Sequence, residues 1–439
     1  MLEIPALWMF PVLFLLVFLG FPVAFSMIAL SFGFGYWFFG ETLGRQLLSR
    51  IQDVSQNYPL TALPLFIFMG SVIERSGIAE QLFHAIQLWI GRLRGGLAHT
   101  SIVMCGVFAA CSGVVGAVET VVGMMAIPPM LKRGYKHDLI SGTICAGGSL
   151  GTIIPPTVVV VLYGSLVQES IADLYAGVVV PGFLMLALFL AYIAIRCRLR
   201  PADAPPLPAA ELQASLGAKL KTTVTAMLPP GILIVAVLGS ILAGVASPTE
   251  AAGVGAFGAV VLTFAYRRMS PRVAFDVIER GIRVNAMVMF TVLGGVMFSS
   301  IFMANGGPQL IRLFLETFKL GPGQLIALML GIIFLLGFIL DWVSIVLICM
   351  PIFAPIVRET GIDRIWFGIM VCVVIQTSYL TPPVAPSIYY LRGIAPPEIR
   401  YESMFLGIIP FVICQLLVLA IVAIYPPTAL YLPALLFGK

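Results

Sequence analysis

Residues 141–164 read SGTICAGGSLGTIIPPTVVVVLYG, and the predicted architecture depends on them. A second stretch of the same kind, residues 376–391, reads QTSYLTPPVAPSIYYL. Each lies in a hydrophobic run long enough to cross a bilayer, and each is interrupted by Gly, Ser, Thr and a Pro-Pro pair, at 155–156 and at 382–383. Proline removes a backbone N–H and clashes with the preceding turn, so both helices must stop or unwind there. Unwound backbone inside a membrane must be buried by protein or hydrated by a cavity, and two matching breaks predict the ion and substrate site of a transporter.

Composition places the whole chain in a membrane. Of its 439 residues 60% are hydrophobic and only 10% are charged, whereas a soluble domain is charged at about a quarter of its positions. Apolar runs such as 10–39 and 228–264 have the length and polarity of helices rather than of barrel strands, which predicts an all-α polytopic membrane protein. The N-terminus has no basic region and no cleavage site, so we expect a retained first span. The net charge of +5 is spread over loops and predicts no nucleic-acid binding.

Charged residues separate the predicted elements. About ten transmembrane crossings are expected, at 5–20, 22–39, 59–74, 139–166, 174–195, 224–245, 250–266, 285–304, 365–391 and 403–425. Two amphipathic segments, 43–57 and 78–93, are predicted to lie along the membrane surface.

Two further apolar runs are predicted to form helical hairpins. Residues 97–131 number 35 and carry Ser112 and Gly113 near their middle, whereas two full crossings need about 40 apolar residues. Residues 322–356 form a second such run, broken at Asp341. Basic residues surround the first hairpin and fill the loops 196–221 and 267–283, so the positive-inside rule places these regions in the cytoplasm. Counting crossings from there puts the second hairpin and both termini outside.

The two halves of the chain resemble each other. The Pro-Pro pairs at 155–156 and 382–383 lie 227 positions apart, and so do Gly134 and Gly361. A shared offset predicts an internal repeat. Each half holds five crossings and a hairpin, and because five is odd the repeats must have inverted topology. The first repeat is expected at 1–197 and the second at 223–439, joined by a Pro/Ala-rich cytoplasmic linker at 198–222.

Four segments resemble a known family, the large membrane subunit of tripartite ATP-independent periplasmic (TRAP) transporters, or DctM-like permeases. They are GGSLGTIIPPT at 147–157, RSGIAEQLFHAIQLWIGRLRGGLA at 75–98, SPTEAA at 247–252 and LTPPVA at 380–385. The resemblance covers nearly the full length and implies a multi-pass elevator-type transporter in a bacterial inner (cytoplasmic) membrane. It implies two partners, a small four-helix DctQ-like membrane subunit and a periplasmic substrate-binding protein. It further implies sodium-driven uptake of an organic acid, usually a carboxylate, with no cofactor other than the transported Na⁺.

The candidate site consists of oxygen ligands at the hairpin tips and on the broken helices facing them. Sodium is a hard cation that takes oxygens from hydroxyls and from unwound backbone. The candidate ligands in the first half are Ser112, Gly113, Gly148, Ser149, Gly151 and Thr152. Those in the second half are Asp341, Ser344, Gln376, Thr377, Ser378 and Thr381. Close helix packing by Gly and Ser remains the alternative interpretation.

Three acidic residues have separate interpretations. Asp341 begins the second arm of its hairpin, where it could cap the helix as well as bind an ion. Glu250 belongs to a Ser-Pro-Thr-Glu capping box, which predicts a structural role. Glu119 departs from the resemblance: it could be a proton carrier, a partner for a basic residue, or a group that reaches water at the cytoplasmic edge, and the last is preferred.

Other functions remain open at this point. The nearest alternative is a self-sufficient ion-coupled carboxylate symporter of the divalent-anion type, and a passive channel is another. An enzyme is not expected, because the sequence has no HExxH, GxSxG or Walker A motif and few intramembrane carboxylates, and no catalytic residue is assigned.

Overall fold

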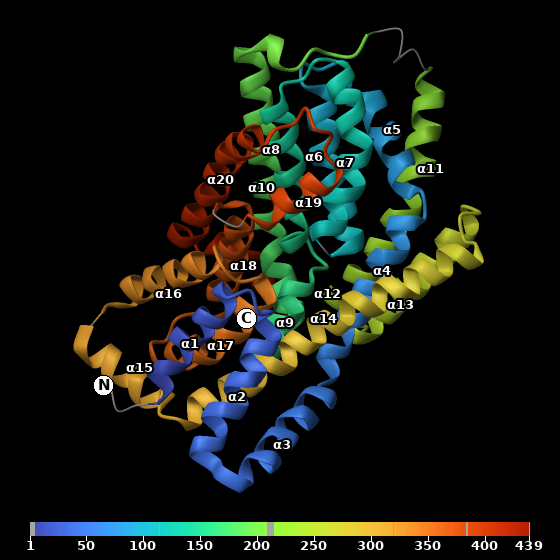
Figure 1. The fold of residues 1–439 in the computed structure, drawn as a ribbon. Coiled ribbons are helices and arrows are strands. Elements are labelled where there is room, and N and C mark those ends of the chain that lie inside the picture. The colour runs from blue at the N-terminus through green and yellow to red at the C-terminus, as the bar shows by residue number, and fades with distance from the viewer. Residues whose placement is uncertain (1–4, 114, 209–214, 319, 383–384, 439) are drawn as a thin grey trace.

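The computed structural model describes residues 5–113, 115–208, 215–318, 320–382 and 385–438. All regular secondary structure in these ranges is helical, which confirms the all-α prediction. The helices form an elongated bundle in which four helices of the first half stand together and two of the second half lie against them (Figure 1). The four are α6 (Gly96–Ser112), α7 (Val115–Lys132), α8 (His137–Ser149) and α10 (Ile171–Leu199), and the two are α18 (Arg364–Leu380) and α19 (Pro386–Ile394).

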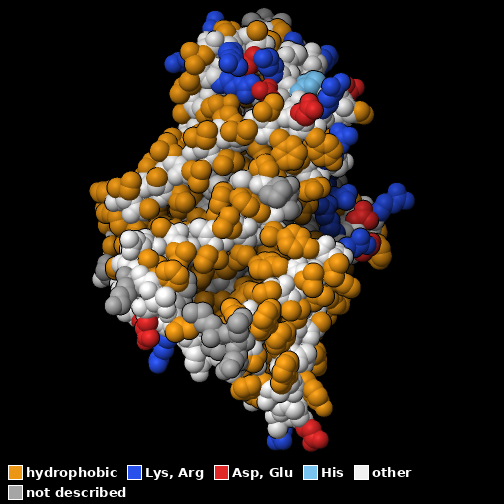
Figure 2. Space-filling view, turned by 60° about the vertical axis from the view of Figure 1, so that its left-hand side comes forward, with side chains coloured by type: hydrophobic (Ala, Val, Ile, Leu, Met, Phe, Trp, Pro, Cys, Tyr) orange, Lys and Arg blue, Asp and Glu red, His pale blue; other side chains and the backbone are white. Residues whose placement is uncertain are grey.

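Seven described helices are long and apolar enough to cross a membrane. They are Val23–Ser55 (α2 and α3 together), Ile171–Leu199 (α10), Leu216–Leu242 (α11 and its continuation), Pro248–Ala265 (α13), Pro271–Ala304 (α14), Trp342–Glu359 (α17) and Tyr401–Ile424 (α20). Large apolar side chains such as Phe18, Phe257 and Ile424 are exposed on them and near them. Figure 2 shows such side chains covering the middle of one face, with charged side chains gathered at one end and at the margins. An apolar outer surface of this extent is what a lipid environment requires.

Several helices differ in length from the segments predicted from the sequence. Helix α1, Ala6–Phe18, has 13 residues and spans about 20 Å, less than the ~30 Å of a bilayer core. Helix α14 begins at Pro271 rather than 285, so most of the predicted loop 267–283 is helical. The reason is a strong start signal, since the Ser270 hydroxyl accepts from the N–H of Val273 and proline follows at the first helical position. Two helices were not predicted, α15 (Gly307–Phe318) and α21 (Pro427–Phe437).

The segment predicted at 59–74 and the amphipathic segment after it form one bent pair. Helix α4, Ala62–Arg75, follows a 3-10 turn at Tyr58–Thr61, and α5, Ile78–Ile90, leaves it at 67°. Gly77 joins them with a φ of 75°, a conformation that glycine adopts without strain. The predicted apolar face of α5 is buried, and its position relative to the membrane surface stays a prediction.

Both hairpins form as predicted. Helices α6 (Gly96–Ser112) and α7 (Val115–Lys132) make the first, and α16 (Pro322–Leu336) and α17 (Trp342–Glu359) make the second. Between α7 and α8, Tyr135 is buried and its hydroxyl accepts from the N–H of Leu97 at 3.3 Å. Burial raises the pKa of Tyr135 to about 12, so the phenol stays neutral and fixes the start of the hairpin.

Both broken helices also form as predicted. Helix α8, His137–Ser149, ends in a 3-10 turn at Leu150–Thr152, and α9 resumes at Val158–Val167. In the second half α18, Arg364–Leu380, stops before the prolines and α19 resumes at Pro386–Ile394; Pro383 itself lies outside the described residues.

Equivalent helices recur at the offset read from the sequence. Helices α7 and α17 each have 18 residues and begin at 115 and 342, an offset of 227. Helices α8 and α18 begin at 137 and 364, again 227 apart. The repeat therefore exists at the level of whole helices, while the boundaries 1–197, 198–222 and 223–439 stay predictions.

The start of the predicted linker is packed rather than free. Helix α10 ends at Leu199 and α11 begins at Leu216. Between them Asp203 is buried, and its carboxylate lies 3.1 Å from Arg196. Arg196 also binds Asp138 of α8 at 2.8 Å. This cluster of ion pairs holds the segment that follows α10 against α8, the first part of the first broken helix.

Candidate cation and substrate site

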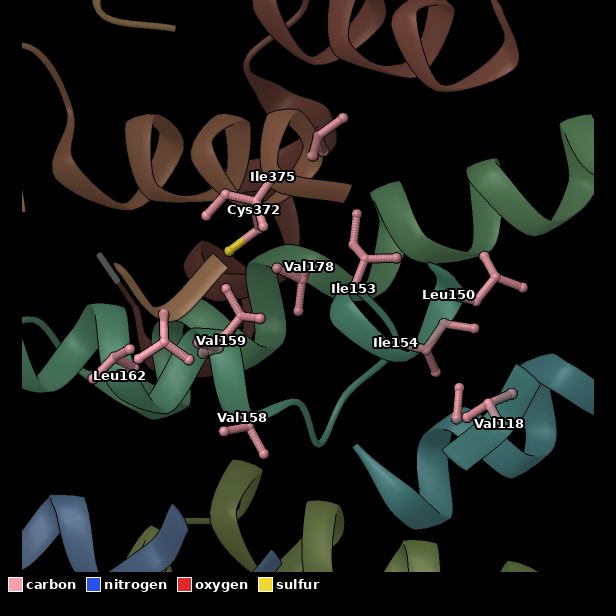
Figure 3. Packing of buried hydrophobic residues seen from close by; sticks show 14 of the residues in the cluster. Val118, Leu150, Ile153, Ile154, Val158, Val159, Leu162, Val178, Cys372 and Ile375 are labelled. Atoms are coloured by element: carbon pink, nitrogen blue, oxygen red, sulfur yellow. The ribbon is translucent and has the colours of Figure 1, made fainter. Parts of the chain in front are cut away.

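The first break is short and lined by apolar side chains. Residues 153–157 have no regular structure, and the hydroxyl of Thr157 accepts from the N–H of Val159 at 3.3 Å to begin α9. Figure 3 shows Ile153 and Ile154 in this break, with Cys372 and Ile375 of α18 beside it. The two broken helices therefore pack together at the point where the first unwinds.

Each hairpin tip touches the broken helix of its own half. Gly113 ends α6 with a φ of 60°, and a Cβ placed there would lie 2.9 Å from the carbonyl oxygen of Pro156. In the second hairpin a Cβ on Gly337 would overlap the side chain of Ser378. Glycine is required at both tips because any side chain would separate the hairpin from the break. The sequence-predicted meeting of tips and breaks is thus present in both halves.

The two halves meet at a buried polar centre formed by Ser149, Gln376 and Gln415. The Ser149 hydroxyl donates to the carbonyl of Ala146 at 2.8 Å and accepts from the amide nitrogens of Gln376 at 3.2 Å and Gln415 at 3.1 Å. Ser149 and Gln376 are 227 residues apart, so they are equivalent positions of the two repeats. The amide oxygens of both glutamines are buried and have no partner among the described residues. A buried oxygen without a partner costs about 1–3 kcal/mol, so this centre suits a cation or another donor.

Four other candidate hydroxyls leave their oxygen lone pairs available. Thr152, Thr377, Ser378 and Thr381 each donate to a backbone carbonyl three or four residues earlier, at 2.7–2.9 Å. A hydroxyl bonded in this way can still offer its oxygen to a cation, although the same bond also occurs in plain helix packing. Cation binding by these residues stays a prediction.

The remaining candidates have differing surroundings. The Ser112 hydroxyl is buried and has no partner in the described part of the chain. Gly151 is buried in the 3-10 turn, and Gly148 faces Glu119 so closely that a Cβ would overlap the Glu119 side chain. Gly148 thus provides room for a neighbouring side chain, a role that the ligand prediction did not include.

Asp341 caps the second arm of its hairpin. Its exposed carboxylate accepts from the N–H groups of Val343 at 3.0 Å and Ser344 at 3.3 Å, and from the Ser344 hydroxyl. The predicted capping role is confirmed, and the ion-binding role of Asp341 and Ser344 stays a prediction. The capping box of Ser247 and Glu250 is also confirmed.

The preferred interpretation of Glu119 is wrong. Its side chain is fully buried and does not reach water at the hairpin's edge, because α8 and α19 cover it. It forms no ion pair with any described residue either. The Ser387 hydroxyl, at the start of α19, donates to it instead. Neither Ser387 nor Gln415 was identified from the sequence. Gln415 could have been found, because it is the one amide side chain in the apolar helix α20 and polar side chains inside membrane helices are usually functional.

The candidate ligands at this site are hydroxyl, amide and carbonyl oxygens, together with the carboxylate of Asp341. The described residues contain no group of three or more His, Cys, Asp or Glu side chains placed to hold a metal ion. The available oxygens suit a hard monovalent or divalent cation rather than a transition metal.

Paired hairpins and broken helices meeting around buried oxygens in an apolar bundle are the arrangement of a membrane transporter. A family model, the DctM component of tripartite ATP-independent periplasmic transporters, matches residues 10–428. The chain belongs to this family and is the large permease subunit of a TRAP transporter.

Curated relatives agree with this assignment, and a solved structure has a similar fold. The chain is 31% identical to the C4-dicarboxylate TRAP transporter large permease DctM of Pseudomonas aeruginosa, over 89% of each chain. It is 31% identical to the ectoine/5-hydroxyectoine large permease UehC of Ruegeria pomeroyi, over 98% and 99% of the two chains. It is 28% identical to the sialic acid large permease SiaM of Vibrio cholerae, over 96% and 97%. In fold it is similar to the YdaH transporter of Alcanivorax borkumensis, with a TM-score of 0.65 over 97% of this chain and 98% of that one, at 15% identity.

Proposed function

We propose that this permease imports an organic acid, a carboxylate, and that a sodium gradient drives the import. The observation that carries the proposal is the buried centre at which Ser149 of one broken helix meets Gln376 of the other. Its oxygens suit a hard cation, and no basic side chain forms an ion pair there among the described residues. Moving an anion into a negative interior costs about 2.3 kcal/mol per charge per 100 mV, and co-bound sodium reverses that cost.

The ligands proposed for sodium lie at the two breaks and the two tips. They are Ser112, Gly113, Gly148, Ser149, Gly151 and Thr152 in the first half, and Asp341, Ser344, Gln376, Thr377, Ser378 and Thr381 in the second. The hairpins and broken helices would move together as an elevator, because each tip is packed against its own break. The two repeats, 1–197 and 223–439, would then alternate access from opposite sides of a bacterial inner membrane.

The substrate is proposed to arrive on a periplasmic binding protein, with a small four-helix membrane subunit completing the complex. Named relatives carry compounds as different as C4-dicarboxylates, ectoine and sialic acid, so the fold alone does not choose among them. We infer that selectivity rests mainly with the binding protein. If the purified permease alone distinguished these compounds as sharply as the complete system, this inference would be wrong.

The test is reconstitution in vesicles. The permease is combined with the proposed small subunit and periplasmic binding protein, and uptake of succinate, ectoine and sialic acid is measured with and without an inward sodium gradient. Accumulation of an acid only with sodium supports the proposal, whereas equal uptake with potassium in place of sodium contradicts it. Uptake by the permease alone would favour the alternative, a self-sufficient carboxylate symporter. Uptake that never exceeds equilibrium would favour a passive channel.

A further inference from the structure

A proline in the second hairpin leaves one carbonyl oxygen without a partner in its own helix. In α17 the residue four positions after Leu347 is Pro351. In a regular α-helix the carbonyl of Leu347 would accept from the N–H of residue 351, and proline has no N–H to give. Because Leu347 is buried, this oxygen needs a donor from another part of the protein.

The donor is Ser299, which belongs to α14. Its hydroxyl donates to the carbonyl oxygen of Leu347 at 2.9 Å, and both residues are buried. The hydroxyl therefore takes the place of the backbone N–H that Pro351 lacks. The bond joins α14 to the second arm of the hairpin.

The same replacement is found in another helix of the bundle. In α11 Pro229 deprives the carbonyl of Thr225 of its helical donor. The hydroxyl of Tyr266, at the end of α13, donates to that carbonyl at 3.2 Å. A hydroxyl from a neighbouring helix thus completes a proline-containing helix at both places.

Two adjacent glycines bring α14 close to its neighbours. A Cβ on Gly295, one turn before Ser299, would lie 2.5 Å from the Cβ of Leu347. A Cβ on Gly294 would lie 2.9 Å from the carbonyl oxygen of Ala24 in α2. Helix α14 therefore packs closely against both α2 and α17 (Figure 1). This close approach places the Ser299 hydroxyl within reach of the hairpin backbone.

The first repeat also makes a hairpin contact at the equivalent position. Helices α5 and α15 begin at 78 and 307, an offset of 229, and the same offset relates Gly70 of α4 to Ser299 of α14. A Cβ on Gly70 would lie 2.7 Å from the carbonyl oxygen of Ser112, at the end of α6. This position therefore faces a hairpin carbonyl in both repeats, and in the second repeat it carries a hydroxyl that donates to it.

The other surroundings of the second hairpin differ from this contact. Near the end of α17, Arg358 donates to the carbonyl of Val167 in α9 at 3.1 Å, which attaches the arm to the first broken helix. The hairpin also borders an apolar cavity of about 620 Å³, whose lining includes Phe10 of α1 and Ile311 of α15. Apolar contacts are non-directional, whereas the hydrogen bond from Ser299 fixes one position of the hairpin along α14.

We propose that Ser299 is a positioning residue, which replaces the N–H that Pro351 lacks and holds the second hairpin at this place on α14. The proposal rests on the elevator movement proposed above, in which the hairpin moves with the broken helices and leaves α14. When the bond breaks, the Ser299 hydroxyl can donate to the carbonyl of Gly295 in its own helix. The Leu347 carbonyl has no such donor in α17, so the hairpin bears the cost of leaving this position.

The first measurement asks whether Ser299 replaces the missing N–H. Thermal unfolding of the full chain in one detergent is compared for Ser299→Ala, Pro351→Ala and the double variant. Alanine at 351 restores the N–H, so we expect Ser299→Ala to lower the unfolding temperature in the wild type and to change it little in the Pro351→Ala background. The matched control is Ser300→Ala, the next and only partly buried serine of α14, whose effect should be equal in both backgrounds. An equal loss from Ser299→Ala in both backgrounds, or no loss in either, overturns the proposal.

The second measurement asks whether the bond positions the hairpin. Spin labels on Met287→Cys in α14 and Leu335→Cys in α16, both exposed positions, report the distance between α14 and the hairpin in lipid nanodiscs. Ser299→Ala should raise the ratio of displaced to undisplaced hairpin about two- to tenfold, as expected for the loss of one hydrogen bond. Pro351→Ala should raise the ratio similarly, because Leu347 then has a donor in both positions, and the double variant should add nothing further.

The two measurements together separate positioning from plain stability. Pro351→Ala should displace the hairpin without the loss of unfolding temperature that Ser299→Ala shows, which a purely structural role of the bond does not predict. Unchanged distances in both single variants refute the positioning role, even if Ser299→Ala is less stable. Neither measurement uses sodium or substrate. Uptake that does not depend on sodium would therefore contradict the proposed function and leave this contact standing, and unchanged distances would do the reverse.

Discussion

Replacing Ser149 with alanine tests the centre that joins the two repeats. The substitution removes the oxygen that accepts from Gln376 and Gln415 and leaves two buried amide nitrogens without that partner. Each unpaired buried donor costs about 1–3 kcal/mol, so we expect a loss of about 2–4 kcal/mol of stability after partial relaxation. The small cavity left by one oxygen adds little to this loss.

The matched control is Ser165→Ala in α9. The Ser165 hydroxyl makes the same kind of bond to a helix carbonyl, that of Val161 at 2.7 Å, but the structure gives it no bond to another helix. Its removal should change stability by about 0–1 kcal/mol. Thermal unfolding of both variants in one detergent compares them directly, and double-mutant cycles of Ser149 with each glutamine divide the loss between the two bonds.

The reasoning fails if Ser149→Ala unfolds at the same temperature as Ser165→Ala. It also fails if the cycle with Gln376 shows no coupling, because the bond between the two repeats would then contribute nothing. A stabilised Ser149→Ala would mean that the centre is held together by other groups.

Three further predictions follow from the same contacts. Thr152→Ala and Ser378→Ala should each raise the sodium concentration for half-maximal uptake in the reconstituted system, and an unchanged value removes that residue from the ligand set. Gly148→Ala should cost about 1–3 kcal/mol in thermal stability because its Cβ overlaps Glu119; a neutral effect would show that α7 moves away freely. Arg196→Met should cost up to about 3 kcal/mol, because the buried carboxylate of Asp203 loses its guanidinium and keeps only Lys136 at 3.3 Å; adding Asp203→Asn should recover part of the unfolding temperature, and no recovery would locate the loss elsewhere.

Breaks and turns could be predicted from the sequence because they depend on local chemistry. The prolines at 155–156 and the pair beginning at Pro382 coincide with helix breaks, and Gly113 ends α6 in a conformation that glycine favours. The Pro-Pro pairs at 128–129 and 229–230 lie inside α7 and α11, so a proline pair alone does not determine where a helix ends. The repeat followed from the same residues, since an offset of 227 between prolines is also the offset between α7 and α17. The all-α class followed from composition together with the length of the apolar runs.

Contacts between distant residues could not be predicted in this way. Gln415 and Ser149 are 266 residues apart, and no periodicity brings them together. The preferred interpretation of Glu119 failed for the same reason, because its burial depends on α19, which is 268 residues later at Ser387. The length of α14 was underestimated because its charged first turns resemble a loop, although Ser270 and the proline after it mark the true start.

The distribution of unsatisfied oxygens connects these contacts to transport. Many polar side chains inside the bundle donate to their own helix, yet some keep a buried oxygen without a hydrogen-bond partner in the described residues. Those of Ser112, Glu119, Thr143, Gln376 and Gln415 lie on a hairpin, on a broken helix or on α20, which packs against α8, whereas that of Asn285 lies on α14. Each such oxygen raises the free energy of the unliganded protein by about 1–3 kcal/mol, so a cation or hydrogen-bond donor bound there would relieve that cost. In the proposed elevator mechanism, this binding energy would be gained only in conformations that keep the hairpins against their broken helices.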